Sequence, residues 1–164
     1  MADRWSRYGV DENEQVIMRQ FMPIADFSGF ESVNLTSGAA DDIVEVRLNA
    51  VGTSVVTVDG NGGDDTLTVV GTEDDDSIFL QRITTNAAPR SQVEVAEMEY
   101  LFVDARGGDD TVVNDTGGGA SLSSSMSSVL SGGFGNDALV GGNFLDVIFG
   151  GADVDALFLS LIHI

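Results

Sequence analysis

The 164-residue chain contains no cysteine and no lysine, and its only histidine is His163, close to the C-terminus. The lack of cysteine excludes disulfide bonds, thiol nucleophiles and cysteine-ligated zinc. Without histidine and lysine, the usual general base and amine nucleophile are also missing from almost the whole sequence. We therefore expect no enzymatic activity in this chain.

The chain also lacks a hydrophobic run of membrane-spanning length, and its first residues, MADRWSRYGV, lack the apolar core of a secretory signal. Basic residues are scarce, with 7 against 27 acidic ones, for a formal net charge of −20. Nucleic acids and anionic membranes bind basic surfaces, so neither nucleic acid nor membrane insertion is expected. Such a charge opposes a compact state unless cations bind to it.

Three consecutive nine-residue repeats occupy residues 132–158, with the sequences GGFGNDALV, GGNFLDVIF and GGADVDALF. Each repeat begins with a glycine pair and has aspartate at position 6 and an aliphatic residue at position 8. The pattern resembles the GGxGxDxUx repeat of the hemolysin-type calcium-binding (RTX) family. The resemblance implies a parallel β-roll in which each repeat forms a half-turn and calcium ions lie between stacked turns.

The residue types fit calcium chemistry. Calcium binds six to eight oxygen atoms, from carboxylates and backbone carbonyls, and glycine lets the backbone take positive φ and approach an ion closely. We expect the glycine pair that starts each repeat to supply that conformation, and the position-8 residues to point inward. These position-8 residues are Leu139, Ile148 and Leu157.

The resemblance implies that Asp137 and Asp155 share one site, whereas Asp146 lies on the other side, opposite Ser128. The candidate metal-site residues of the three repeats are Asp137, Asp155, Asp146, Gly133, Gly135, Gly142, Gly151 and Asp153. At position 4 only Gly135 fits the family pattern; Asp153 tolerates the left-handed region, but Phe144 would be strained there. The alternative interpretation is that the aspartates are solvated turn residues without a metal.

Looser copies of the pattern occur upstream, as GNGGDDTLT (60–68), GTEDDDSIF (71–79) and ARGGDDTVV (105–113). They add Asp65, Asp76 and Asp110 as candidate metal ligands at position 6. Asp-Asp steps recur in these copies, which favours a scaffold over a single catalytic carboxylate pair. Alternating apolar pairs recur about every eleven or twelve residues and predict regular short strands. These pairs are Val44/Val46, Val56/Val58, Leu67/Val69 and Ile78/Leu80.

We divide the chain into five segments: a lead-in (1–29), degenerate β-repeats (30–116), a Ser/Gly linker or worn repeat (117–131), the three nonapeptides (132–158) and a short tail (159–164). In the lead-in, 12–21 is ambiguous between helix and other structure. The tail, LSLIHI, resembles the translation of a transposon-adapter sequence. We expect it to be an artefact, with a genuine closing strand as the alternative.

The sequence thus predicts an all-β fold, a parallel β-roll or β-helix solenoid. Its predicted function is to bind Ca²⁺ and so couple calcium to the folding of a secreted or cell-surface bacterial protein. The alternative is a calcium-dependent adhesin or surface-layer module with a glycan or protein ligand. Phe79, Tyr100 and Phe102 could line such a ligand face, although core or edge positions are the favoured interpretation.

Overall fold

The computed structural model describes residues 15–17, 32–48, 55–82, 93–115 and 126–159, which contain β-strands and turns and no helix. The strands are β1 (Gln15–Ile17), β2 (Ser32–Thr36), β3 (Ile43–Arg47), β4 (Val55–Asp59), β5 (Thr66–Val70), β6 (Ser77–Arg82), β7 (Val93–Ala96), β8 (Tyr100–Asp104), β9 (Thr111–Asp115), β10 (Ser127–Phe134), β11 (Ala138–Val140), β12 (Asp146–Ala152) and β13 (Ala156–Phe158). The predicted all-β class is confirmed.

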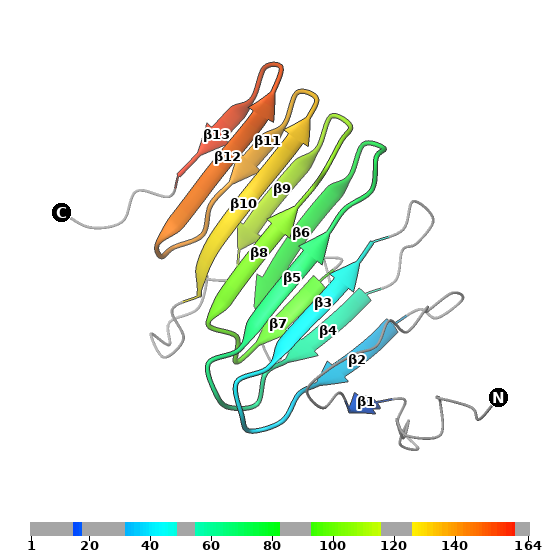
Figure 1. The fold of residues 1–164 in the computed structure, drawn as a ribbon, viewed down its shortest axis with the longest axis vertical. Coiled ribbons are helices and arrows are strands. Elements are labelled where there is room, and N and C mark those ends of the chain that lie inside the picture. The colour runs from blue at the N-terminus through cyan, green and yellow to red at the C-terminus, as the bar shows by residue number, and fades with distance from the viewer. Residues whose placement is uncertain (1–14, 18–31, 49–54, 83–92, 116–125, 160–164) are drawn as a thin grey trace.

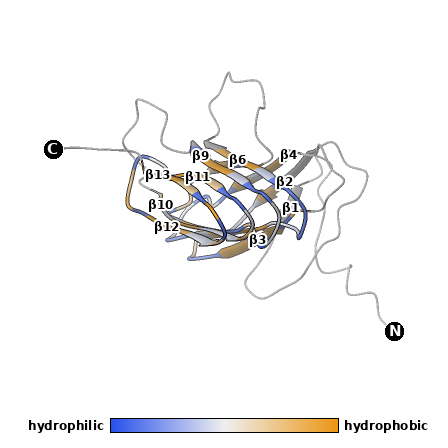
Figure 2. Ribbon diagram, turned by 90° about the horizontal axis from the view of Figure 1, so that it is seen from above, coloured by the Kyte–Doolittle hydropathy of each residue, from blue (hydrophilic) through white to orange (hydrophobic). Residues whose placement is uncertain are grey.

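All pairs between these strands are parallel, and the strands form two sheets that lie as two layers (Figure 1). Sheet A has the order β1-β2-β4-β7-β6-β9-β11-β13, and sheet B has the order β12-β10-β8-β5-β3. From β2 onward the chain alternates between the two sheets, except at β6 and β7. Many of the turns that join the layers are hydrophilic (Figure 2).

The β6–β7 step is the irregular part of the topology. Both strands belong to sheet A, and β7 lies between β4 and β6, so the chain steps back by one strand before it crosses to β8. Residues in equivalent places of neighbouring turns are therefore 34 apart at Asp76 and Asp110. They are only 18 apart at Asp137 and Asp155, where each strand and turn takes nine residues.

The core lies between the sheets and follows the period-2 alternation of the strands. Strand β3 alternates exposed and buried residues, with Val44 and Val46 facing inward, and β8 does the same with Leu101 and Val103. The inward residues of both sheets belong to one cluster of buried side chains. The predicted apolar pairs therefore mark strands, and both members of each pair belong to the core, with Val56 alone only partly buried.

The sheets continue without a break from the degenerate repeats into the nonapeptides. Strand β10, which begins at Ser127 inside the predicted linker, pairs with β8 on one side and β12 on the other. Most of the ambiguous segment 12–21, the start of the linker and 160–164 lie outside the described residues.

Phe79, Tyr100 and Phe102 are exposed at 40%, 46% and 45%, so the interpretation of these rings as core residues is wrong. Each occupies an outward position, flanked in its strand by buried residues such as Ile78 and Leu101. The aromatic rings extend the outer faces of the sheets instead of filling the space between them. No helix that could cross a membrane occurs in the described part of the chain.

Candidate metal centre

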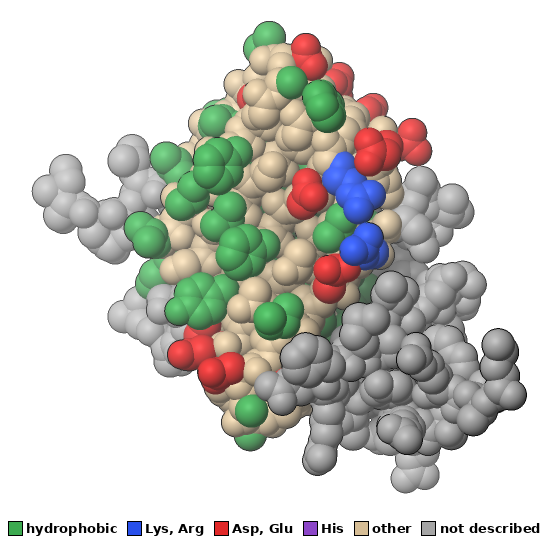
Figure 3. All heavy atoms as spheres, viewed as in Figure 1, with side chains coloured by type: hydrophobic (Ala, Val, Ile, Leu, Met, Phe, Trp, Pro, Cys, Tyr) green, Lys and Arg blue, Asp and Glu red, His purple; other side chains and the backbone are tan. Residues whose placement is uncertain are grey.

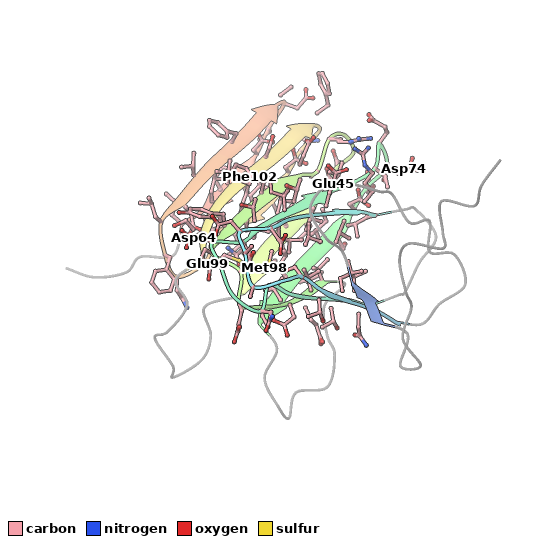
Figure 4. The ribbon with its side chains drawn as sticks, turned by 60° about the horizontal axis from the view of Figure 1, so that its bottom comes forward. Glu45, Asp64, Asp74, Met98, Glu99 and Phe102 are labelled. Carbon is pink, nitrogen blue, oxygen red and sulfur yellow. The ribbon has the colours of Figure 1, made fainter. Side chains whose placement is uncertain are left out.

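The turns stack in two rows, one along each edge of the double layer. The A-to-B edge holds the turns that lead from sheet A to sheet B, and the B-to-A edge holds those that lead back. Asp64 and Glu99 lie at the A-to-B edge and Asp74 at the B-to-A edge (Figure 4). The sequence-predicted aspartates are therefore divided between the edges. Asp65 and Asp146 lie at the A-to-B edge, and Asp76, Asp110, Asp137 and Asp155 at the B-to-A edge.

The position-6 aspartates of the B-to-A edge form a continuous ladder. The backbone N–H of Asp76 donates to Asp110 Oδ1 at 2.7 Å, and the N–H of Asp110 donates to Asp137 Oδ1 at 2.9 Å. The N–H of Asp137 donates in turn to Asp155 Oδ1 at 3.1 Å. The structure thus brings Asp137 and Asp155 together, as the sequence predicts, and adds Asp76 and Asp110 to the same row.

The side chains at position 5 form a second ladder, in which each one accepts a hydrogen bond from the following turn instead of from the preceding turn. Asp75 Oδ1 accepts from the N–H of Asp109, and Asp109 Oδ1 accepts from the N–H of Asn136, both at 2.8 Å. Asn136 Oδ1 then accepts from the N–H of Val154 at 3.2 Å. Because each Asp-Asp step supplies one carboxylate to each ladder, adjacent turns are joined in both directions.

The A-to-B edge uses the same arrangement with different residues. The N–H of Asp42 donates to Asp65 Oδ1 at 2.8 Å, and the N–H of Asp65 donates to Glu99 Oε2 at 2.7 Å. Further along this edge, the hydroxyl of Ser128 donates to Asp146 Oδ1 at 2.5 Å. Asp146 therefore lies on the side away from Asp137 and opposite Ser128, as predicted.

Three position-6 side chains each hold one oxygen that is buried and has no hydrogen-bond donor. Asp65, Asp110 and Asp137 are at most 1% exposed, and their Oδ2 atoms have no partner. The corresponding oxygens of Asp42 and Asp76 accept from the N–H groups of Gly38 and Thr72. An anionic oxygen without a donor is costly to bury, so each of these three atoms is a place for a proton, a cation or a bound water.

The first glycine of the turn makes room for that oxygen. A Cβ at Gly132 would lie 2.1 Å from Asp137 Oδ2 and 2.5 Å from the carbonyl oxygen of Gly150 in the next turn. A Cβ at Gly60 would likewise meet Asp65 Oδ2 at 2.5 Å and the carbonyl oxygen of Glu97. A carboxylate oxygen and a carbonyl oxygen from successive turns thus converge beside one glycine, which is the donor chemistry that calcium prefers.

The glycine pair supplies the predicted positive φ only in the first and third nonapeptides, and there only at its second residue. Gly132, Gly141 and Gly150 do not take positive φ, and they are needed because they carry no side chain beside the carboxylate. The left-handed conformation occurs one residue later, at Gly133 (φ 117°) and Gly151 (φ 119°). These two residues give the turn its sharp corner.

The remaining candidate residues, at positions 2 and 4 of the repeats, differ in whether they take positive φ. Gly135 and Asp153 have positive φ, at 120° and 77°, as the pattern predicts. Phe144 does not adopt positive φ, so the strain expected there is avoided and this turn takes another path. Gly142 also lacks positive φ, and an added Cβ would meet Asn114 Nδ2 at 2.8 Å.

The inward position-8 residues differ in burial along the stack of turns. Leu139 is fully buried, and Ile148 packs against the core. Leu157 lies in register with Leu139 but is 47% exposed, because β13 is an end strand of sheet A. Leu157 therefore occupies the predicted inward position, but the end of the stack leaves it exposed.

Burial, hydrogen bonds and neighbouring carboxylates shift the pKa values of three aspartates at the edges. Burial raises the pKa of Asp110 to about 6; the hydrogen bond from the Asp76 N–H opposes this rise, and the charges of Asp137, Asp76 and Asp75 add to it. Burial also raises the pKa of Asp65, with smaller contributions from Glu99 and other neighbouring carboxylates. In contrast, hydrogen bonds from the backbone and side chain of Asn136 lower the pKa of Asp109.

Neither Arg47 nor Arg106, whose side chains the structure describes, pairs with a buried carboxylate. Their ion pairs join Arg47 to Glu45 and Arg106 to Glu73, all on side chains that are at least partly exposed. No group of three or more His, Cys, Asp or Glu side chains converges in the described part. Any cation here would therefore depend mainly on backbone carbonyls, with one or two carboxylates.

Sequence reasoning missed several members of the two ladders. Glu99 replaces aspartate in the short turn before β8, and Asp75, Asp109 and Asn136 form the position-5 ladder. The recurring Asp-Asp step was the available signal, because a pair of adjacent carboxylates repeated at 41–42, 64–65, 74–76 and 109–110 indicates two structural roles.

Comparison with known proteins adds no relative. No family model matches the chain, and no curated protein and no solved structure is significantly similar to it.

Proposed function

We propose that the chain is a calcium-binding module whose stacked turns form a closed parallel β-roll, and that calcium couples to its folding. The observation that carries this proposal is the set of buried, partnerless Oδ2 atoms on Asp65 at one edge and on Asp110 and Asp137 at the other. Each belongs to a turn built on the repeated Gly/Asp pattern. The alternation of the chain between two parallel sheets supports the roll.

The residues present fit the cation. Asp137 would hold it through Oδ2, with backbone carbonyls of its own turn and of the Gly150 turn. The upstream counterparts are Asp65 beside Gly60, Asp76 beside Gly71, and Asp110. Calcium accepts such mixed oxygen sets and varied geometry, whereas magnesium demands a near-ideal octahedron. A divalent ion also supplies the positive charge that the buried carboxylates lack.

Calcium would act on folding by mass action. A ligand that binds only the folded state stabilises it, by about 1.4 kcal/mol per site when its concentration is ten times the dissociation constant. Sites of extracellular modules have dissociation constants of roughly 10⁻⁴ to 10⁻³ M. Several such sites in series would make folding depend on the millimolar calcium found outside cells. This dependence suits a secreted or surface-exposed bacterial protein.

Calcium titration of the full chain tests the proposal. In chelator, Asp137→Asn keeps an acceptor for the Asp110 N–H and removes a buried charge, so its thermal midpoint should equal or exceed that of the wild type. With calcium, the same variant should need a severalfold higher concentration to reach half-maximal β circular dichroism. Asp104→Asn, an exposed carboxylate on β8, is the matched control and should behave as wild type.

Two results would contradict calcium binding. Spectra and melting temperatures that do not respond to calcium in the wild type would remove the proposal altogether. Equal shifts for Asp137→Asn and Asp104→Asn would show that calcium acts by general screening of the acidic surface and not at the turns.

A further inference from the structure

The outer face of sheet B carries the exposed charges of Glu45 and Arg47 on β3, but it is largely uncharged and partly aromatic over β8, β10 and β12. We define the sheet B face by the outward residues of β5, β8, β10 and β12, all of which except the buried Val70 are at least partly exposed: Thr66, Thr68, Val70, Tyr100, Phe102, Asp104, Ser127, Val129, Ser131, Val147 and Phe149. Hydrophobic side chains gather on this face (Figure 3). Tyr100, Phe102, Val147 and Phe149 are all more than two-fifths exposed.

Strand register arranges the face in rows that run across the strands. The central row is Thr68, Phe102, Val129 and Val147. One flanking row is Thr66, Tyr100 and Ser127, and the other is Val70, Asp104, Ser131 and Phe149. Hydroxyl groups therefore lie on both sides of an apolar row. Neighbouring strands are about 4.8 Å apart, so β8 to β12 spans about 10 Å.

Charge selects among the ligands for this face. Asp104 is the only charged residue of the sheet B face as defined; Glu45 and Arg47 lie at its border on β3, and the turn edges are crowded with carboxylates. A basic partner would be drawn to the edges, and an acidic polymer would be repelled by the net charge of −20. A second copy of the chain would bring the same negative charge with it. A neutral ligand meets none of these obstacles.

We propose that the sheet B face binds a neutral polysaccharide lying across β8, β10 and β12. Sugar rings combine an apolar C–H face with hydroxyl groups around their edge. The negative ring faces of Phe102 and Tyr100 attract the C–H face, and the hydroxyls of Thr66, Ser127 and Ser131 exchange hydrogen bonds at its edges. Exposed aromatic side chains on a rigid sheet lose little conformational freedom on binding.

Phe79 supplies a matched control. It is exposed to nearly the same extent as Phe102, at 40% against 45%, but lies on β6 in the other sheet. Its row continues across sheet A through Val113, Val140 and Phe158, and the hydroxyls of Ser77 and Thr111 lie in the row on one side of it. Its replacement removes a similar aromatic area without touching the sheet B face.

The test measures binding of the full chain, in calcium, to insoluble cellulose and chitin and to soluble mannan and dextran. Binding to at least one of them is expected, and it should not change between low and high salt. The double variant Tyr100→Ala/Phe102→Ala should weaken binding by about tenfold or more, as for aromatic hot spots at interfaces. Phe79→Ala should bind as wild type. Circular dichroism of each variant confirms that the fold is kept.

Three outcomes would overturn the proposal. The first is no binding to any of the four neutral polysaccharides. The second is an equal loss in Phe79→Ala and the double variant, which would place the site elsewhere. The third is a concentration-dependent dimer in sedimentation velocity that the double variant abolishes, which would make the sheet B face an interface between copies.

Discussion

The first glycine of each turn is fixed by the carboxylate that lies against it. At Gly132, any side chain would occupy the position of Asp137 Oδ2 and press on the Gly150 carbonyl. At Gly62, by contrast, an added Cβ meets nothing within 4 Å, and the residue does not take positive φ. Two glycines of similar turns therefore differ sharply in their tolerance of a side chain.

We predict that Gly132→Ala lowers the free energy of unfolding by about 2 kcal/mol or more, because overpacking displaces buried backbone. Gly62→Ala should be neutral or slightly stabilising, because alanine restricts the unfolded chain. Urea unfolding in calcium measures both. A Gly132→Ala protein as stable as Gly62→Ala would show that the Asp137 carboxylate does not occupy the space beside Gly132.

Position 6 was readable from sequence because the glycine and aspartate spacing repeats there. The different hydrogen-bonding roles of the two aspartates in each Asp-Asp step could not be predicted, because they depend on which neighbouring turn each carboxylate contacts. Asp109 accepts from a later turn and Asp110 donates toward one, although the two are adjacent in the chain. Only the stacking of turns distinguishes them.

At the scale of strands, the alternation of apolar residues was sufficient to predict β3 to β6 and their inward faces. The place of β7 was not predictable, since local patterning cannot show that a strand inserts between two earlier ones. Tyr100 and Phe102 were misjudged for a related reason. Aromatic residues favour strands in general, and their outward position is decided by register with Leu101 and Val103.

Strand β10 offers a direct comparison of the two faces. Leu130 is fully buried in the core cluster, and Val129 points outward in the sheet B face. Leu130→Ala should lower the free energy of unfolding by about 2 to 5 kcal/mol, because it leaves a cavity. Val129→Ala should cost much less. Urea unfolding in calcium compares them, and similar losses would mean that β10 is paired in another register.

For the whole molecule, the stability of the folded state depends on pH through the buried carboxyl groups. The pKa of Asp110 is raised from 3.8 to about 6 in the folded state. The folded state therefore binds this proton more tightly than the unfolded state does. The resulting stability is present below about pH 4 and is lost as the pH rises through 6, and Asp65 contributes in the same direction.

We predict that, in chelator, Asp110→Asn gains stability over the wild type as the pH is raised from 4 to 7, by up to about 3 kcal/mol. Near pH 4 the two proteins should be similar, because Asp110 is then protonated in the wild type. Thermal unfolding across this range measures the difference. Asp104→Asn is the control, and a difference between Asp110→Asn and wild type that does not vary with pH would refute the linkage.

The interlocked ladders also determine how the molecule can change length over generations. In the last coils, equivalent turn residues recur every 18 residues, and each turn bonds only to its immediate neighbours. Duplication of two successive repeats would insert one strand into each sheet and leave every older pairing intact. Duplication of a single repeat would instead exchange the edges and place Asp137 against the row of Ser128 and Asp146. Genes for this architecture should therefore grow and shrink by pairs of repeats.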